Sequence, residues 1–130
     1  MGSKRTRPYH AGAAGAVSVA EAEILFSDAN QDVVDIPAGA VITRVWAEIL
    51  TAFNGGTTNV LTVGVTGTQE KYLAAADIAE GTPGASAAKG PYAAEAAAVT
   101  VKAFYSQTGT AATTGKARIF VEFTRLAANG

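Results

Sequence analysis

The sequence predicts an all-β fold, a sandwich or barrel, and three observations support this. Segments rich in Val, Ile, Thr and aromatic residues alternate apolar with polar side chains, as half-buried strands do. Clusters of Gly, Pro and Asn separate these segments. A helix-like pattern is confined to one short stretch. At 130 residues the chain has the size of a single domain, which buries roughly two-thirds of the surface that its unfolded form exposes.

Residues 1–15 are predicted to form an extended arm, and residues 16–130 the β-sandwich domain. The arm begins with the basic residues Lys4, Arg5 and Arg7 and continues into a Gly/Ala tract without a periodic apolar face. Its basic start is typical of a secretory signal, but no Leu-rich stretch follows. We therefore interpret residues 1–15 as part of the mature protein.

Two strands are expected before residue 40. Residues 17–26 have alternating positions, with one face formed by Ala20, Ala22, Ile24 and Phe26. A polar loop at residues 27–32 and a short strand at residues 33–36 follow. This strand ends in a turn at Pro37–Gly39, because proline presets one turn position and glycine tolerates positive φ.

Residues 41–53 are predicted to form the central strand, with the odd-numbered side chains facing the core. Turn residues flank both of its ends. Residues 60–65 follow the turn at residues 54–59 and are interpreted as the returning strand of a hairpin. The expected core residues of the central strand are Val41, Thr43, Val45, Ala47, Ile49, Thr51 and Phe53.

Residues 66–98 form a Gly-, Ala- and Pro-rich connection with one expected helical turn at residues 72–78. A connection of this length in a compact domain usually binds a partner or crosses between sheets. Two further strands are expected at residues 99–107 and 116–126. Their predicted inward residues are Val99, Val101, Ala103 and Tyr105 in the first strand, and Ala117, Ile119, Val121 and Phe123 in the second.

The outward side chains of the strands at 41–53 and 116–126 share the order Arg, aromatic, Glu at the same spacing. If the two strands are antiparallel neighbours, every cross-strand pair is chemically compatible. The predicted pairs are Arg44 with Glu122, Trp46 with Phe120, Glu48 with Arg118, Val45 with Val121 and Ala47 with Ile119.

No set of residues indicates catalysis, a cofactor or a metal site, so we do not expect an enzyme. The chain has no cysteine, and its one histidine, His10, lies in the arm. Residues 28–32 begin like a calcium loop but lack its glycine and its bidentate glutamate. Glu21 and Glu23 share a strand face, and we interpret them as solvated rather than catalytic carboxylates.

Charge and hydropathy point to a protein partner. The formal charge of −1 argues against a general nucleic-acid binder, and Arg44 and Glu48 interrupt the longest apolar stretch, so no membrane span is expected. Only 16% of the residues are charged, which favours association with another surface.

Two candidate binding regions follow from this low charge. Arg44, Trp46 and Phe120 are the candidate oligomer or partner interface, since Trp and Arg favour interfaces; alternatively, Trp46 is simply a partly covered aromatic residue. The basic residues of the arm, Lys4, Arg5 and Arg7, either solvate the chain or dock on an acidic partner.

A family resemblance rests on five stretches of turn and core residues within residues 33–126. They are Val33-Val34-Asp35-Ile36-Pro37-Ala38-Gly39-Ala40-Val41-Ile42-Thr43, Thr51-Ala52-Phe53-Asn54-Gly55-Gly56-Thr57-Thr58, Leu61-Thr62-Val63-Gly64, Lys71-Tyr72-Leu73-Ala74-Ala75 and Ala117-Arg118-Ile119-Phe120-Val121-Glu122-Phe123. In these stretches the chain resembles the head decoration, or cement, proteins of tailed bacteriophages.

The resemblance implies a β-sandwich of jelly-roll type that is made in the cytoplasm of the host bacterium. It also implies a homo-oligomer, often a trimer, that binds the major capsid protein on the outer surface of the capsid. Capsid docking by Lys4, Arg5 and Arg7 fits this role. The runner-up interpretation is a carbohydrate-binding module of a phage tail or fibre, which would need exposed aromatics beside Asp, Asn or Gln in one concave patch.

Overall fold

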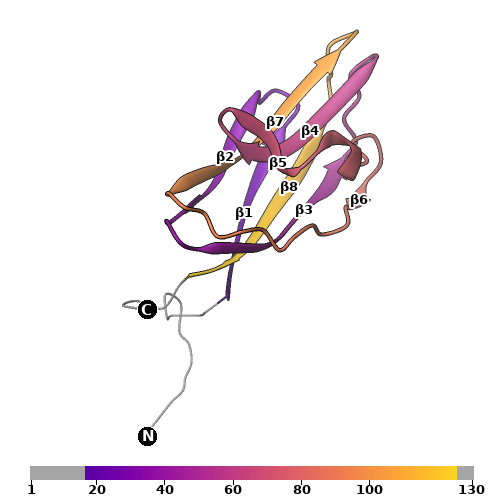
Figure 1. Ribbon diagram of the computed structural model, residues 1–130. Coiled ribbons are helices and arrows are strands. Elements are labelled where there is room, and N and C mark those ends of the chain that lie inside the picture. Colours follow the sequence, from indigo (N-terminus) through magenta and orange to yellow (C-terminus); the bar gives the residue numbers. More distant parts are fainter. Residues whose placement is uncertain (1–16, 126–130) are drawn as a thin grey trace, which may run out of the picture.

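The computed structural model describes residues 17–125, which form eight strands and one short 3-10 helix (Figure 1). The elements in chain order are β1 (Val17–Leu25), β2 (Asn30–Ile36), β3 (Val41–Thr51), β4 (Thr58–Val65), β5 (Thr68–Leu73), η1 (Ala75–Asp77), β6 (Gly84–Ala85), β7 (Val99–Thr108) and β8 (Lys116–Thr124). The proposed arm at residues 1–15 lies outside the described residues.

The strands form two four-stranded antiparallel sheets, which confirms the β-sandwich. The first sheet has the order β1-β8-β3-β6 and the second the order β2-β7-β4-β5. The jelly-roll type stays a prediction. It is supported by the eight strands in two sheets and by the pairing of β1 with β8, which brings the first and last strands side by side.

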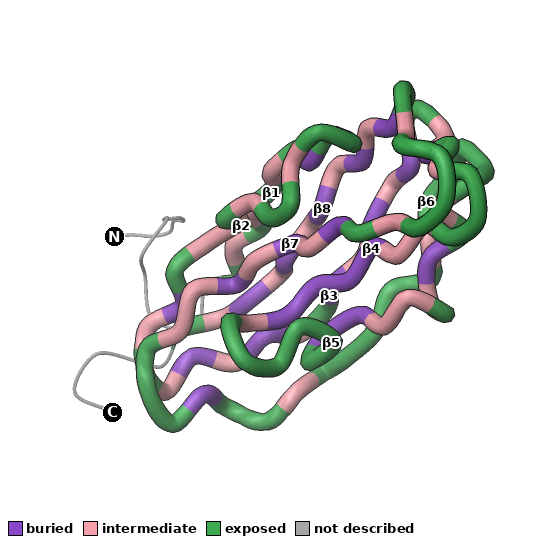
Figure 2. The backbone as a smooth tube through the Cα atoms, turned by 90° about the horizontal axis from the view of Figure 1, so that it is seen from above, coloured by how far each residue is buried: buried purple, intermediate pink, exposed green. Residues whose placement is uncertain are grey.

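The core lies between the two sheets and runs along β3, β8, β4 and β7 (Figure 2). The predicted inward faces of the last two strands are confirmed, with Val99 half-buried at the start of β7. The fully buried aliphatic side chains come from both sheets: Ile24, Ile36, Ile42, Val45, Leu61, Val63, Leu73, Val101, Ile119 and Val121.

The expected core face of the central strand is only partly right. The pairing register with β8 shifts between Ile42 and Arg44, so that Ile42 and Val45 are both buried. Such a bulge places two residues of one strand opposite one of its partner and reverses the alternation. Val41 and Thr43 are consequently only half-buried. A second shift next to Thr51 leaves that residue exposed, whereas Phe53 is buried as predicted.

The hairpin expected between β3 and β4 is wrong, because the two strands belong to different sheets. β4 pairs with β7 and β5 instead. The residues between β3 and β4 bond to other segments: Phe53 N–H donates to Glu80 O at 3.0 Å, and Gly56 N–H donates to Thr110 O at 2.8 Å. These bonds guide the chain across the sandwich instead of back along β3.

Two expected boundaries near the start also differ. β2 begins at Asn30, so it takes in part of the expected polar loop, and its register shifts between Asp32 and Val34. β1 ends at Leu25, which leaves Phe26 exposed instead of inward. The turn before β3 is as predicted, since Gly39 has a φ of 86°.

The connection at residues 66–98 crosses between the sheets, which is one of its two expected roles. It contributes β5 to the second sheet and β6 to the first, and the expected helical turn is reduced to η1. Its later part runs along the edge of β3 through main-chain bonds of 2.7–3.0 Å to Ala47, Val45, Ile42 and Ala40. This segment, residues 84–95, therefore closes one edge of the first sheet. Within residues 17–125, no helix has the length and apolar character of a membrane span.

Candidate interaction surface

The outer face of the first sheet carries a stacked aromatic pair. Trp46 of β3 lies opposite Phe120 of β8, with ring centroids 5.0 Å apart and ring planes 10° apart. Both side chains point away from the core because they alternate with buried neighbours. The predicted antiparallel register of these strands is confirmed at each of its five pairs.

Arg44 fixes one end of this pair. Its guanidinium lies 5.2 Å from the centre of the Trp46 ring and holds Glu122 through two bonds, Nε to Oε1 at 3.1 Å and Nη2 to Oε2 at 3.0 Å. Thr43 Oγ1 also donates to Glu122 Oε1 at 2.8 Å. The hydrogen bonds from Arg44 and then Thr43 hold the pKa of Glu122 below its usual value. Arg44, Trp46 and Phe120 thus contact one another in a single cluster on the outer face of the first sheet.

The neighbouring part of the same face has an excess of negative charge. Arg118 lies 3.5 Å from Glu21, 3.5 Å from Glu23 and 3.9 Å from Glu48. One guanidinium cannot neutralise three carboxylates, and Lys116 is the next cation along β8. The face therefore combines aromatic surface with acidic surface.

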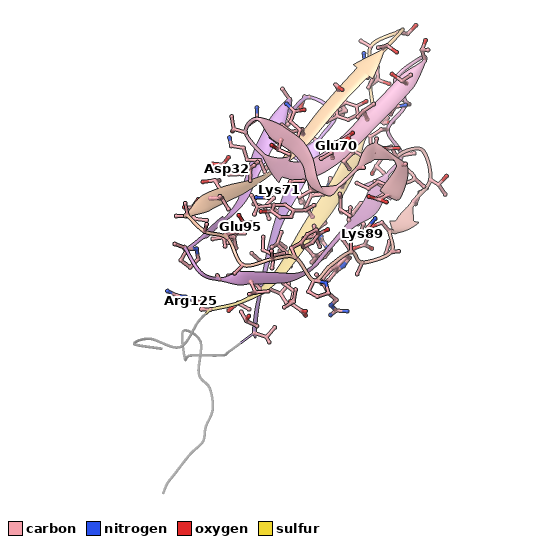
Figure 3. All side chains as sticks on the ribbon, in the orientation of Figure 1. Asp32, Glu70, Lys71, Lys89, Glu95 and Arg125 are labelled. Carbon is pink, nitrogen blue, oxygen red and sulfur yellow. The ribbon has the colours of Figure 1, made fainter. Side chains whose placement is uncertain are left out.

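A buried carboxylate joins the connection to the sandwich. Glu95 is 7% exposed and accepts bonds from Tyr72 Oη at 2.5 Å and Lys71 Nζ at 3.0 Å; Figure 3 shows Lys71 and Glu95 close together. Burial alone would raise the pKa of Glu95, but the hydrogen bonds from Tyr72 and Lys71 and the charge of Lys71 outweigh it and lower that pKa. Tyr92 Oη donates to the carbonyl oxygen of Tyr72. All these groups have partners, so the cluster holds structure and offers no free acid or base.

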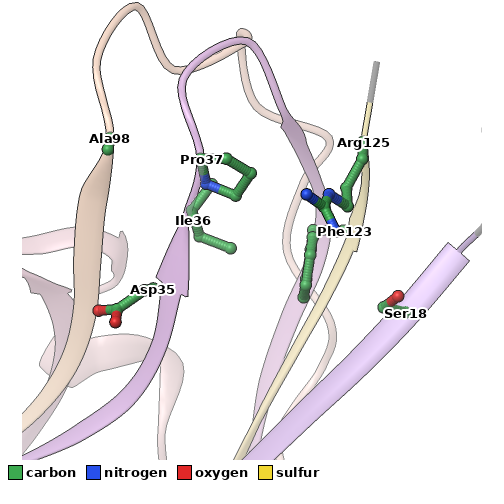
Figure 4. Close-up of a pocket in the computed structure, with 7 residues that line it drawn as sticks. All are labelled: Ser18, Asp35, Ile36, Pro37, Ala98, Phe123 and Arg125. Atoms are coloured by element: carbon green, nitrogen blue, oxygen red, sulfur yellow. The ribbon is translucent and has the colours of Figure 1, made fainter. Parts of the chain in front are cut away.

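A cavity of about 340 Å³, open to solvent, lies where β1, β2 and β8 meet (Figure 4). Its lining is largely apolar, with Asp35 and Arg125 on opposite sides. Asp35 Oδ1 already accepts a bond from Thr100 Oγ1 at 2.7 Å. The residues around the cavity are Ser18, Asp35, Ile36, Pro37, Ala98, Phe123 and Arg125.

No protein-family model matches the chain, and no curated protein matches it. Two solved structures do. The chain shares its fold with chains of two phage capsids. One belongs to the capsid asymmetric unit of cyanophage Pam1, with a TM-score of 0.68, 21% identity and 93% coverage of each chain. The other belongs to the acid-stable capsid of Helicobacter pylori bacteriophage KHP30, with a TM-score of 0.66, 17% identity, and coverage of 83% of this chain and 86% of that one.

The structure brings Arg44, Trp46 and Phe120 together, while Lys4, Arg5, Arg7 and His10 lie outside the described residues. The side chain of Asp28, in the loop weighed as a calcium site, accepts a bond from Leu25 N–H at 2.9 Å. Among residues 17–125, no three His, Cys, Asp or Glu side chains are grouped in a way that could hold a metal ion.

Sequence reasoning missed the Glu95 cluster and the cavity. Glu95 lies 23 positions after Tyr72 and 24 positions after Lys71, its two side-chain partners. Its surroundings in the sequence are rich in Ala, so the sequence alone suggests an ordinary exposed charge. The cavity is formed by residues of three strands, of two loops and of the segment after β8, which no local pattern connects.

Proposed function

We propose that this protein is a structural component of a tailed-phage virion that decorates the outer surface of the capsid, and not an enzyme. The single observation that carries the proposal is the shared fold, which spans 93% of this chain and 93% of a chain in the Pam1 capsid asymmetric unit. In this proposal its partner is the major capsid protein, and it stabilises the lattice by bridging neighbouring subunits.

In this proposal the protein acts as a closed homo-oligomer, and a trimer is the favoured state. The Arg44, Trp46 and Phe120 cluster supports this, because Trp and Arg are enriched among the residues that dominate binding energy and here lie together on one outer face. The low proportion of charged residues, 16%, fits a molecule with much of its surface covered in the assembly.

Lys4, Arg5 and Arg7 are proposed to dock on an acidic surface of the capsid. Three cations within four positions give a strong local charge, and such contacts weaken as salt is raised. Docking by the arm and docking by the sheet face are separable by mutation.

The carbohydrate-binding alternative is less well supported by the site. Phe120 stacks on the ring of Trp46 and Arg44 lies over it, so this ring is engaged within the chain and is not free to stack on a sugar.

The test is binding to capsids of the parent phage that lack this protein. The expected results are saturable cosedimentation and cryo-electron density at repeated positions on the outer surface. Trp46→Ala should weaken oligomerisation or capsid binding, whereas the matched control Phe104→Ala, which removes a half-buried aromatic from the outer face of the second sheet, should not. Absence of binding, or density on the inside of the shell, would overturn the proposal.

A further inference from the structure

The two sheets differ in how their edges are protected against pairing with another chain. The β3 edge of the first sheet is covered by residues 84–95. In the second sheet, both edge strands have register shifts against their neighbours and carry exposed charges, such as Asp32 on β2 and Glu70 on β5. Bulges, charges and covering segments are the usual ways in which proteins block unwanted strand addition.

β1 has neither a register shift nor a covering segment among the described residues, and its exposed charges are the two carboxylates Glu21 and Glu23. Its nine residues pair with β8 in one unbroken register, and the strand contains no proline or lysine. The described residues form no ladder along its other edge. The exposed large hydrophobic residues of the described chain are all on β1 or directly after it: Val17 at 60%, Val19 at 53%, Leu25 at 38% and Phe26 at 37% exposure.

The free backbone groups of β1 belong to its odd-numbered residues. Phe26 N–H donates to Gly115 O at 3.0 Å, on the β8 side, whereas Leu25 N–H donates to the Asp28 carboxylate at 2.9 Å. Because the direction of the N–H groups alternates along a strand, Val19, Glu21 and Glu23 direct their N–H and C=O groups away from β8. These groups are available to an added strand.

We propose that this edge of β1 binds residues 5–11 of a neighbouring copy as an additional antiparallel strand. The inference rests on the proposed homo-oligomer but does not require the capsid. It concerns the protein before it binds a capsid. At that stage the acidic surface open to the basic arm is the one around Glu21 and Glu23 of another copy.

Charge complementarity selects the occupant. β1 contributes Glu21 and Glu23 and no cation to the acidic face around Arg118, so pairing β1 with β1 of another copy would bring four carboxylates together. Residues 5–11 offer cations at matching spacing. In one antiparallel register, Arg5 lies opposite Glu23 and Arg7 lies opposite Glu21.

The rest of that register is also compatible. Tyr9 then lies opposite the exposed Val19, so an aromatic ring covers an apolar side chain. Pro8 lies opposite Ala20, whose N–H points toward β8, so the missing N–H of proline falls on the side where no bond to β1 is needed. Pairing the two arginines in a parallel strand is also possible, but every ladder in the described residues is antiparallel.

A neighbouring copy is the proposed donor because the protein is proposed to be a homo-oligomer. The alternative donor is the same copy, since the five residues Gly-Ala-Ala-Gly-Ala at 12–16 have the length and the glycines of a hairpin loop. The first test below distinguishes the two donors. If each copy donates one strand and accepts one, the contact is head-to-tail, and it forms a closed ring when the rotation between copies is that of a cyclic symmetry.

The first test is cross-linking in the full chain, which has no native cysteine to interfere. Under mild oxidation, the double substitution Arg7→Cys/Glu21→Cys should form disulfides between copies, visible as dimers and higher species on a denaturing gel. The matched control Thr6→Cys/Glu21→Cys should form few, because in this register the Thr6 side chain points to the opposite face. Disulfides only within one copy would overturn the exchange between copies. Equal yields in both variants would overturn the register.

The second test measures self-association by sedimentation and does not depend on oxidation. Arg5→Glu/Arg7→Glu should raise the dissociation constant of the oligomer by about tenfold or more, since it replaces attractive pairs with repulsive ones. The control Thr6→Glu adds a negative charge to the same segment on the opposite face and should have a much smaller effect. An unchanged dissociation constant in the double variant would remove the arm from the β1 edge. Capsid decoration would still stand if that variant bound capsids normally.

Discussion

The β3–β8 pair and the connection at residues 66–98 are held to the sandwich in different ways. β3 and β8 meet through side chains whose partners mirror one another in the sequence, Arg44 with Glu122 and Trp46 with Phe120. The connection is held mainly by main-chain bonds to β3 and by one buried carboxylate, Glu95. Side-chain alternation therefore specifies faces and register, whereas a segment fixed through its backbone leaves little trace in the sequence.

The largest effect is expected in the β3–β8 pair. Ile119→Ala should lower the free energy of unfolding by about 2–5 kcal/mol, because Ile119 is fully buried and its truncation opens a cavity. Denaturant unfolding measures this. The control Lys116→Ala, on the outward face of the same strand, should stay within about 0.5 kcal/mol of the wild type. Similar losses in both variants would mean that the two faces of β8 are not distinct.

Glu95→Ala tests the connection and should cost about 1–3 kcal/mol, because the buried Tyr72 hydroxyl loses its acceptor. Hydrogen exchange should show the loss first in the amides that join residues 84–95 to β3. Glu70→Ala, an exposed change on β5, is the control. If the two variants are equally stable, Glu95 does not hold the connection.

Acid should weaken the same region. The folded-state pKa of Glu95 is lowered, so its contribution is present above the unfolded pKa of about 4.3 and is lost as the pH falls through the folded value. Glu95→Gln should be less stable than the wild type at pH 7, and this difference should shrink below about pH 4. Unfolding curves at a series of pH values measure it. A constant difference would show that the charge of Glu95 is not responsible.

The smallest effect is expected on the outer face of the β3–β8 pair. Arg44→Glu or Glu122→Arg places like charges opposite each other at an exposed site, so each should destabilise the protein slightly, far less than Ile119→Ala. The double reversal should recover most of the loss. A double variant that only sums the two single losses would mean that this ion pair adds nothing to the register.

The sequence was sufficient for the sandwich, for the inward face of β8 and for the pairing of β3 with β8. It was insufficient where a local pattern has more than one structural outcome. The residues after β3 look the same whether they close a hairpin or cross to the other sheet, and they cross. Nothing in the β-branched run from Val41 to Thr43 marks the bulge that turns Ile42 inward.

In β5 and β1 the sequence pattern misleads in opposite ways: it hides a strand at β5 and suggests buried side chains on β1. β5 begins Thr-Gln-Glu-Lys and is exposed over those residues, so it lacks the alternation that reveals a strand. Val17 and Val19 have the apolar, β-branched side chains that are typical of core positions in strands, and yet both are exposed. The candidate interface at Trp46 and Phe120 was predictable because its residues repeat a pattern on two strands, whereas the open edge depends on which strand ends the sheet.

The position of Trp46, stacked on Phe120, also makes its intrinsic fluorescence a reporter of binding at this face. Trp46 is the single tryptophan of the chain, so its fluorescence comes from one known place on the outer face of the first sheet. A partner that covers this face would change the emission directly. A strand added beyond β1 would lie about three strand spacings, roughly 14 Å, from β3 and leave the ring surroundings largely unaltered. Emission spectra recorded during assembly can therefore distinguish coverage of the face from pairing at the edge, without any label.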